Sequence, residues 1–390
     1  MARRLLPALV IVLLIAAGAR LYRIDAQSLW NDEGNSLRLA ERNVPDLIDA
    51  AARDIHPPGY YLALKAWIAL AGTSELALRA LSALAGVLTV AATIALGRRL
   101  FSAGAGALSG LLVALSPLAI YYSQETRMYA LLGLLAALSM AVFVEWLARV
   151  EQDRAAWAWA LALVNAAGLY THYAYPFTLL AQGALFLLWL AWRGRSGVGR
   201  RALTGYVALN LLALALFAPW LPTAWDQLTT WPEAQTALSL GERLRASLSA
   251  ITVGGAVRDL PWSALIAPGV LALGVLFGEH HRRALPRGWR ALLPPLWVVA
   301  TVGGLLLSGA YRPTNLKFLV PASAAAALWL AGGAAGWWRA FRTRVWLRAA
   351  PLLLVGVILV AQLRTLDALY HDPAAARADY RAIAARLARE

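Results

Sequence analysis

Long apolar runs separated by short, arginine-rich polar segments dominate this chain of 390 residues. A run of about 20 apolar residues is long enough to cross a bilayer as a helix. Such runs cover residues 5–22, 76–97, 103–121, 129–148, 156–171, 175–192, 202–220, 262–278, 291–309, 318–338 and 349–364. The pattern predicts an all-α polytopic membrane protein of about eleven transmembrane helices. The first run also has the basic start and small-residue end of a cleaved signal peptide, but the many later runs favour a retained helix.

A twelfth apolar stretch decides the topology. The stretch "PPGYYLALKAWIALAG" from Pro57 is short, opens with two prolines and carries Lys65 in its middle. These features predict a helix that lies in the membrane interface rather than one that crosses. With eleven crossings, eighteen of the 36 basic residues gather on one side with only four acids. Because cytoplasmic loops are rich in Lys and Arg, that side is predicted to be cytoplasmic, and a twelfth crossing would invert every later arginine cluster.

The amino-acid composition limits the kinds of molecule that the chain is expected to bind. The chain is 60% hydrophobic and 15% charged, which is outside the usual range of soluble domains. It has no cysteine, which excludes disulfides and thiolate metal sites. The net charge of +15 would suit nucleic acid, but the arginines lie between apolar runs, where lipid headgroups are the expected partners. We therefore expect a bilayer protein that does not bind nucleic acid.

Two segments on the predicted outer side are long, residues 23–75 and 221–261, whereas most inner loops are short. Binding and catalytic residues concentrate in such loops, so function is expected on the outer face. The last segment, 365–390, is polar and helix-favouring. The predicted organisation is a transmembrane domain of residues 1–364, with both long loops, followed by an outer polar tail of residues 365–390.

Four polar stretches fall on this outer face: "LWNDEGNS", "DIHPPGYY", "YYSQETRMYALLGLL" and "LYTHYAY". In this order, within an apolar polytopic chain, they resemble the GT-C superfamily of membrane glycosyltransferases. The branch they resemble is that of protein O-mannosyltransferases and aminoarabinose transferases, glycosyltransferase family 39. The resemblance runs from Arg3 to about Trp192 and returns at "YRPTNLKFLVP". It implies a GT-C bundle with interfacial helices in its first outer loop, in the plasma (inner) membrane.

The resemblance also implies an inverting transfer of a sugar from a polyprenyl-phosphate donor to an acceptor on the extracytoplasmic face. Asp32 and Glu33 match the acidic pair of the family's first outer loop, in which one carboxylate takes the proton of the acceptor. We assign this role to Asp32 because it holds the first position of the pair. A base within hydrogen-bond reach accelerates such a step by roughly 100 to 10,000-fold. The alternative is an ordinary pair of solvated loop acids.

Four cations are predicted to hold the donor phosphate: Arg79, Arg127, Lys317 and Arg312. Arg79 resembles the arginine at the start of the second helix of O-mannosyltransferases, and its guanidinium suits bidentate phosphate binding. Snorkelling of Arg79 to the interface is the alternative. Lys317 and Phe318 stand where the family commonly has Arg-Tyr, so the charge is kept but the planar fork is lost. Arg312 could compensate.

The remaining candidates are substrate-binding residues. Glu125 and Arg127 are two residues apart and could hold acceptor and donor phosphate, or form a simple ion pair. Gln124 and Tyr129 could line the same pocket.

Three further side chains have a functional and a plainer interpretation. His56 could orient the acidic loop or contact the acceptor, or begin a helix with its ring in water. His172 and Tyr173 could contact the sugar or belong to an interfacial aromatic belt. The segment 221–261, with Trp225 and Trp231, could fold over the site as a lid or form a plain interfacial helix.

The same residues bear on whether the reaction needs a metal ion and on which other function is possible. Asp32, Glu33, His56 and Glu125 could supply hard metal ligands, but the resemblance implies a metal-independent reaction, so we expect no catalytic metal. The sequence has no glycine-rich phosphate loop of the kind that binds nucleotides, which suits a donor that is not a nucleotide sugar. The rival function is a transporter or flippase of a lipid-linked sugar, which the apolar helix middles disfavour. The acceptor, bearing a hydroxyl or a phosphate, and the sugar are left open.

Overall fold

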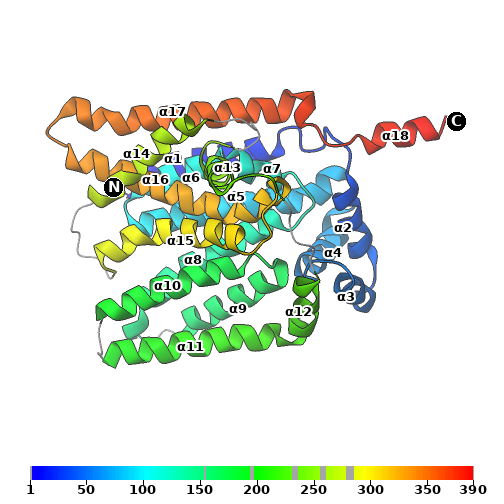
Figure 1. Cartoon of the computed structure of the whole chain (residues 1–390), viewed down its shortest axis with the longest axis horizontal. Helices are drawn as coiled ribbons and strands as arrows, with labels where there is room; N and C mark the ends of the chain where they lie inside the picture. The colour runs from blue at the N-terminus through cyan, green and yellow to red at the C-terminus, as the bar shows by residue number, and fades with distance from the viewer. Residues whose placement is uncertain are drawn as a thin grey trace.

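The computed structural model of the chain describes residues 2–152, 155–193, 197–230, 236–254, 261–277 and 285–389, and these are mostly helical, with no strand among them. The predicted all-α class is confirmed. The long helices run side by side as a bundle, with the N-terminus at one end and the C-terminus beyond the other (Figure 1). They are α1 (Ala2–Leu21), α5 (Glu75–Leu100), α6 (Ala103–Ala114), α8 (Tyr129–Ala148), α9 (Ala155–Thr171), α10 (Pro176–Arg193), α11 (Gly197–Phe217), α15 (Arg287–Leu307), α16 (Val320–Ala340) and α17 (Val345–His371).

Each predicted apolar run corresponds to a helix or to consecutive helices. Six described helices are long and apolar enough to cross a membrane, and a bent pair, α6 with α7 (Pro117–Ser123), makes a seventh. Shorter apolar helices occupy Leu6–Leu21, Ala155–Thr171 and Trp262–Phe277, the last built from η3 (Trp262–Leu265), α14 (Ile266–Leu273) and η4 (Gly274–Phe277). The structure therefore describes a multi-pass helical membrane protein.

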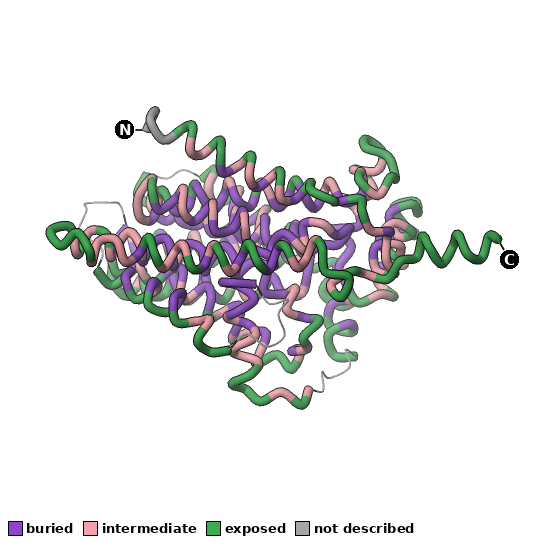
Figure 2. The backbone as a smooth tube through the Cα atoms, turned by 90° about the horizontal axis from the view of Figure 1, so that it is seen from above, coloured by how far each residue is buried: buried purple, intermediate pink, exposed green. Residues whose placement is uncertain are grey.

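Burial separates the inner helices from the lipid-facing ones. In the apolar window of the span Pro313–Ala340, which includes α16, 89% of the residues are buried, against 17% in that of α17. Figure 2 shows the buried residues gathered along the inner helices, while the C-terminal helix α18 (Tyr380–Leu387) is exposed. Exposed leucines such as Leu352 and Leu353 on α17 are the expected surface of a helix that faces hydrocarbon.

The break between α6 and α7 places a polar loop at one end of the bundle. Helix α6 ends at Ala114, three residues before Pro117, and the two helices meet at 59°. The last carbonyls of a helix have no partner within it. Here Arg20, buried at the end of α1, supplies one: Nη1 donates to Ala114 O (3.1 Å) and Nη2 to Val113 O (3.3 Å). The Arg20 Nε group also donates to Ser123 Oγ (3.2 Å), so one side chain fixes the bend.

Short helices gather at that end, which we name the site end: α2 (Asn31–Glu41), α3 (Val44–Ala52), α4 (Gly59–Ala71) and α12 (Leu221–Thr229) (Figure 1). The predicted interfacial stretch from Pro57 forms α4, which has only 13 residues. Gln227 ties α12 to the end of α3, because its Nε2 donates to the carbonyls of Ala51 (2.9 Å) and Asp54 (2.7 Å).

The structure changes the description of two predicted segments, the C-terminal tail and the loop of residues 221–261. Helix α17 continues beyond residue 364 to His371, so the predicted boundary between residues 1–364 and the tail falls inside a helix. In the predicted lid segment, Trp231 lies outside the described residues, whereas α13 (Leu240–Thr252) packs against α16 and against η5 (Pro313–Leu319). The tail and α13 are thus part of the site end.

Candidate active site

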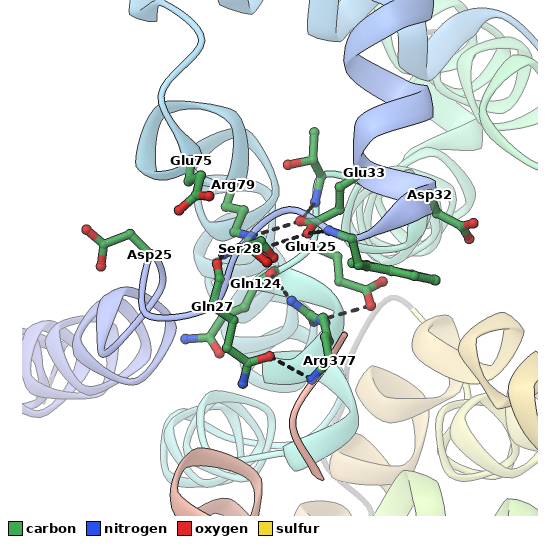
Figure 3. Close-up of polar contacts among 12 residues, drawn as sticks. Asp25, Gln27, Ser28, Asp32, Glu33, Glu75, Arg79, Gln124, Glu125 and Arg377 are labelled. Carbon is green, nitrogen blue, oxygen red and sulfur yellow. Dashed lines mark hydrogen bonds and ion pairs between the residues drawn. The ribbon is translucent and has the colours of Figure 1, made fainter. Parts of the chain in front are cut away.

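Glu33 is an anchor of the first loop. It lies in the first turn of α2 and is fully buried. Arg79 of α5 binds it in bidentate fashion, with Nε to Oε1 at 2.8 Å and Nη2 to Oε2 at 2.6 Å, and Thr126 N–H donates to Oε1 at 2.8 Å (Figure 3). Burial raises the pKa of Glu33, but the hydrogen bonds and charge of Arg79 outweigh burial and lower it overall. We therefore assign Glu33 to positioning rather than to proton transfer.

The predicted phosphate-binding role of Arg79 is wrong. Besides Glu33, its Nη1 donates to Ile24 O and Gln27 O (both 2.7 Å) and its Nη2 to Ser28 O (3.0 Å). A guanidinium has five N–H groups, and these contacts use all of them. The residue is also only 1% exposed. Arg79 therefore fastens the first loop to α5 and has no donor left for a ligand.

Asp32 faces the opposite way from its neighbour. Successive residues on an α-helix point about 100° apart, so burial of Glu33 turns Asp32 toward open space. Its side chain is 30% exposed, and its Oδ2 lies 3.8 Å from Arg127 Nη2. Figure 3 shows Asp32 on α2 pointing away from the Glu33 cluster. Of the acidic pair, Asp32 alone lines a cavity that a substrate can enter.

Two cavities meet at Asp32. The first, which we call the polar cavity, has a volume of about 560 Å³ and is lined by His56, Arg127 and Arg312 among others. The second, the aromatic cavity, has a volume of about 400 Å³. Tyr121, Tyr122, Glu125, Tyr129 and Leu118 are among its lining residues. Three residues line both cavities: Asp32, Thr314 and Lys317.

Lys317 and Arg127 provide positive charge at this junction. Lys317 lies on η5, with its ammonium 5.0 Å from the centre of the Tyr129 ring, and it makes no ion pair in the part of the chain that the structure describes. Arg127 is buried, and its Nη1 donates to Asp32 O and Ser36 Oγ (both 3.3 Å). Its guanidinium lies 5.9 Å from the same tyrosine ring. Arg312, a third predicted cation, lines the polar cavity together with Arg127 and Lys317.

A residue that sequence reasoning missed, Arg377 of the tail, pairs with Glu125 in the wall of the aromatic cavity. Glu125, in the loop between α7 and α8, is 2% exposed and pairs with Arg377 of the tail (Nη2 to Oε1, 3.2 Å), not with Arg127 (Figure 3). Arg377 also donates from its backbone to Gln27 Oε1 (2.9 Å) and from Nη1 to Gln124 O (3.0 Å). Burial raises the pKa of Glu125 to about 7 even with this partner. Nothing in the local pattern of the tail distinguishes Arg377 from its other arginines.

Gln124 does not line the cavity that was predicted for it. Its Nε2 donates to the carbonyls of Arg20 (3.1 Å) and Tyr22 (2.8 Å), so the amide is turned toward the end of α1. Tyr129, by contrast, lines the aromatic cavity as expected.

The two histidines lie together and are buried. The rings of His56 and His172 are 5.5 Å apart, and His56 Nδ1 is 3.6 Å from Asp54 Oδ2. Burial lowers the pKa of both, so both are neutral near pH 7, and the interpretation of His56 as a water-exposed ring is wrong. Tyr173 donates to Gln227 and accepts from Trp220 Nε1 (3.0 Å), which holds α12 in place. Sugar contact by His172 and Tyr173 stays a prediction.

The four candidate metal ligands do not form one group. Among the described residues, no set of three or more His, Asp or Glu side chains is placed to hold a metal ion. Glu33 is occupied by Arg79 and Glu125 by Arg377. Metal independence of the reaction stays a prediction.

The bundle with its site end has the fold of GT-C membrane glycosyltransferases. ArnT from Cupriavidus metallidurans, in a crystal structure bound to undecaprenyl phosphate, matches with a TM-score of 0.62 and 16% identity over 92% of this chain and 75% of that one. The oligosaccharyltransferase AglB from Archaeoglobus fulgidus, in complex with an inhibitory peptide and a dolichol-phosphate, matches with a TM-score of 0.63 and 12% identity over 93% of this chain. The match spans 55% of AglB.

The sequence itself points to a particular branch. The model of the dolichyl-phosphate-mannose-protein mannosyltransferase family matches residues 55–223. This segment is less than half of the chain and includes His56, Arg79, Glu125 and Arg127, but not Asp32 or Lys317. No curated protein sequence matches the chain. The resemblance to GT-C glycosyltransferases of the mannosyltransferase branch is confirmed.

Proposed function

We propose that this protein is an inverting glycosyltransferase that moves a sugar from a polyprenyl-phosphate donor to an acceptor on the extracytoplasmic face of the membrane. One observation carries the proposal. The carboxylate of Asp32 and the ammonium of Lys317 line both the polar and the aromatic cavity, at one end of a GT-C bundle. A base and a phosphate-binding cation thus share the junction of two substrate-sized spaces.

The aromatic cavity suits the lipid donor. Its wall combines tyrosines with apolar side chains such as Leu118, Leu316 and Leu369, and Lys317 lies at its junction with the polar cavity. The polyprenyl phosphates in the titles of the ArnT and AglB structures support a lipid phosphate in this fold. Lys317 and Arg127 would stabilise the negative charge that develops on the departing phosphate.

The polar cavity would receive the acceptor. Asp32 takes the proton of the acceptor oxygen while that oxygen attacks the anomeric carbon from the side opposite the phosphate. The new glycosidic bond forms as the bond between the anomeric carbon and the phosphate oxygen breaks, and the lipid phosphate leaves with the electron pair. A single displacement of this kind inverts the anomeric centre.

The rival function, transport, finds no support in the membrane part of the bundle. Buried polar side chains there bond to one another instead of forming a path: Ser139 Oγ donates to Asn165 Oδ1 (2.5 Å), and Asn165 Nδ2 to Gln182 Oε1 (3.3 Å). Tyr175 Oη also donates to Asn165 Oδ1 (2.9 Å). A closed network of this type fixes helices against one another.

The test is donor turnover by the purified protein. Release of free lipid phosphate from a radiolabelled polyprenyl phosphate sugar should be roughly 100-fold slower or more in Asp32→Asn, which keeps the shape but cannot take the proton. Donor binding, measured separately, should stay nearly unchanged because the base acts in the transition state. Asp49→Asn, an exposed acid on α3, is the matched control. Full turnover in Asp32→Asn would remove the proposed mechanism.

A further inference from the structure

The polar cavity holds more positive charge than a single donor phosphate requires. Five cationic side chains line it against two carboxylates, Asp32 and Asp54. The cations are Arg42, Arg53, Arg127, Arg312 and Lys317.

Both carboxylates contact other side chains, and neither forms an ion pair with Arg42 or Arg53. Asp32 pairs with Arg127 (3.8 Å), and Asp54 accepts a hydrogen bond from Tyr61 Oη (3.1 Å) and lies 3.6 Å from His56 Nδ1. In the described ranges of the chain, neither arginine makes an ion pair. Both arginines are exposed, and like charges that line one cavity attract anions into it.

The positions of Arg42 and Arg53 separate them from the donor. They cap the C-terminal ends of α2 and α3. A cation at a helix C-terminus is favourable in its own right. That effect explains each residue singly, but it does not require both to line one cavity. Both line the polar cavity and neither lines the aromatic cavity, whereas Lys317 lines both.

We infer that the acceptor carries an anionic group, a phosphate or a carboxylate, which Arg42 and Arg53 hold while its nucleophilic oxygen reaches Asp32. This inference rests on the proposed function, because it takes the polar cavity to be the acceptor site. Guanidinium forks match the geometry of phosphate and carboxylate oxygens and bind them with charge-assisted hydrogen bonds. The two arginines would thus select an acidic acceptor over a neutral one.

The experiment measures binding of small probes to the full-length protein in nanodiscs of zwitterionic phosphatidylcholine. Saturating undecaprenyl phosphate fills the donor phosphate site, and benzyl phosphate, phenylacetate and benzyl alcohol are then titrated in parallel. Wild-type protein should bind at least one of the two anions more tightly than the alcohol. The double variant Arg42→Gln, Arg53→Gln should weaken that binding roughly 10-fold at low ionic strength, and less at high salt, because exposed charges are screened.

Arg38→Gln is the matched control, because Arg38 is exposed on the same helix and does not line the cavity. It should bind the probes as the wild type does. The ranking of phosphate and carboxylate identifies the acidic group. Equal binding of all three probes, or anion binding that survives in the double variant, overturns the inference. Since no turnover is needed, that failure is distinct from full activity of Asp32→Asn, which overturns the proposed mechanism.

Discussion

At the scale of single residues, the acidic pair shows how neighbouring carboxylates take different roles. Glu33 is enclosed by Arg79 and Thr126, and Asp32 is open to two cavities. The helical turn between them, rather than their chemistry, makes this difference. Substitution of Asp32 should therefore reduce turnover, whereas substitution of Glu33 should reduce stability.

We predict that Glu33→Gln lowers stability far more than Asp32→Asn does. Removing one partner of a buried ion pair leaves an uncompensated charge and typically costs about 3–5 kcal/mol. The measurement is the thermal unfolding midpoint in detergent. Arg79→Lys should show a similar loss because lysine lacks the fork that serves Glu33 and three carbonyls.

Glu41→Gln, which changes an acid in an exposed pair with Arg38, is the control for these variants and should leave the midpoint unchanged. If Arg79→Lys unfolded at the wild-type temperature but lost affinity for the donor, Arg79 would have to be returned to the phosphate site.

At the scale of elements, the site depends on segments that are far apart in the chain. The loop between α7 and α8 meets the tail through Glu125 and Arg377, while Arg20 of α1 fixes the bend before that loop. Gly86 of α5 makes room for this arrangement, because a Cβ there would come within 2.2 Å of Ser123 Oγ and 2.4 Å of Arg20 Nε. The packing of four elements therefore sets the position of Glu125.

We predict a pH dependence of stability that arises from Glu125. Burial raises its pKa from 4.5 to about 7 in the folded protein. Between these values the folded state holds a proton that the unfolded state has lost, so stability should fall as the pH rises from 4.5 to about 7. Unfolding midpoints across this range should show the fall in wild-type protein, and Glu125→Gln should remove its share.

The variant Arg377→Ala provides a second test of this pH dependence. Loss of the cation leaves the buried carboxyl still harder to ionise, so the fall in stability should extend to higher pH than in the wild type. Identical pH profiles for the wild type and Glu125→Gln would mean that Glu125 does not titrate in this window.

At the scale of the whole molecule, orientation follows from where charge and function lie. Arg98 and Arg99 at the end of α5 and Arg339 near the end of α16 lie at the opposite end of the bundle from α2, α3 and α4 (Figure 1). From the positive-inside rule we predict that the site end faces the outside.

Because the chain has no cysteine, this orientation can be tested with single cysteines at exposed positions. We expect Thr73→Cys, at the site end, to react with an impermeant thiol reagent in intact cells, and Thr343→Cys, in the loop before α17, to react only after permeabilisation. The opposite labelling pattern would invert the orientation and place the proposed reaction in the cytoplasm.

The order of apolar and polar residues along the chain was enough to predict the class of fold and the end of the bundle where the polar motifs meet. Backbone groups in hydrocarbon must be satisfied within each segment, so long apolar runs form helices almost regardless of their neighbours. It also separated α4 from the spanning helices, because length, two prolines and a central lysine are local properties.

Which charged residues are free to act depends instead on how the helices and loops pack together. Arg79 and Glu33 are 46 positions apart and satisfy each other, whereas Arg377 reaches the loop of Gln124 from 253 positions away. The role of a buried charge depends on the partners that the fold brings to it, and those partners are absent from any local pattern of residues. For the same reason the sequence could single out Asp32 as the candidate base, but it could not show that Asp32 faces the cavities while Glu33 is buried against Arg79.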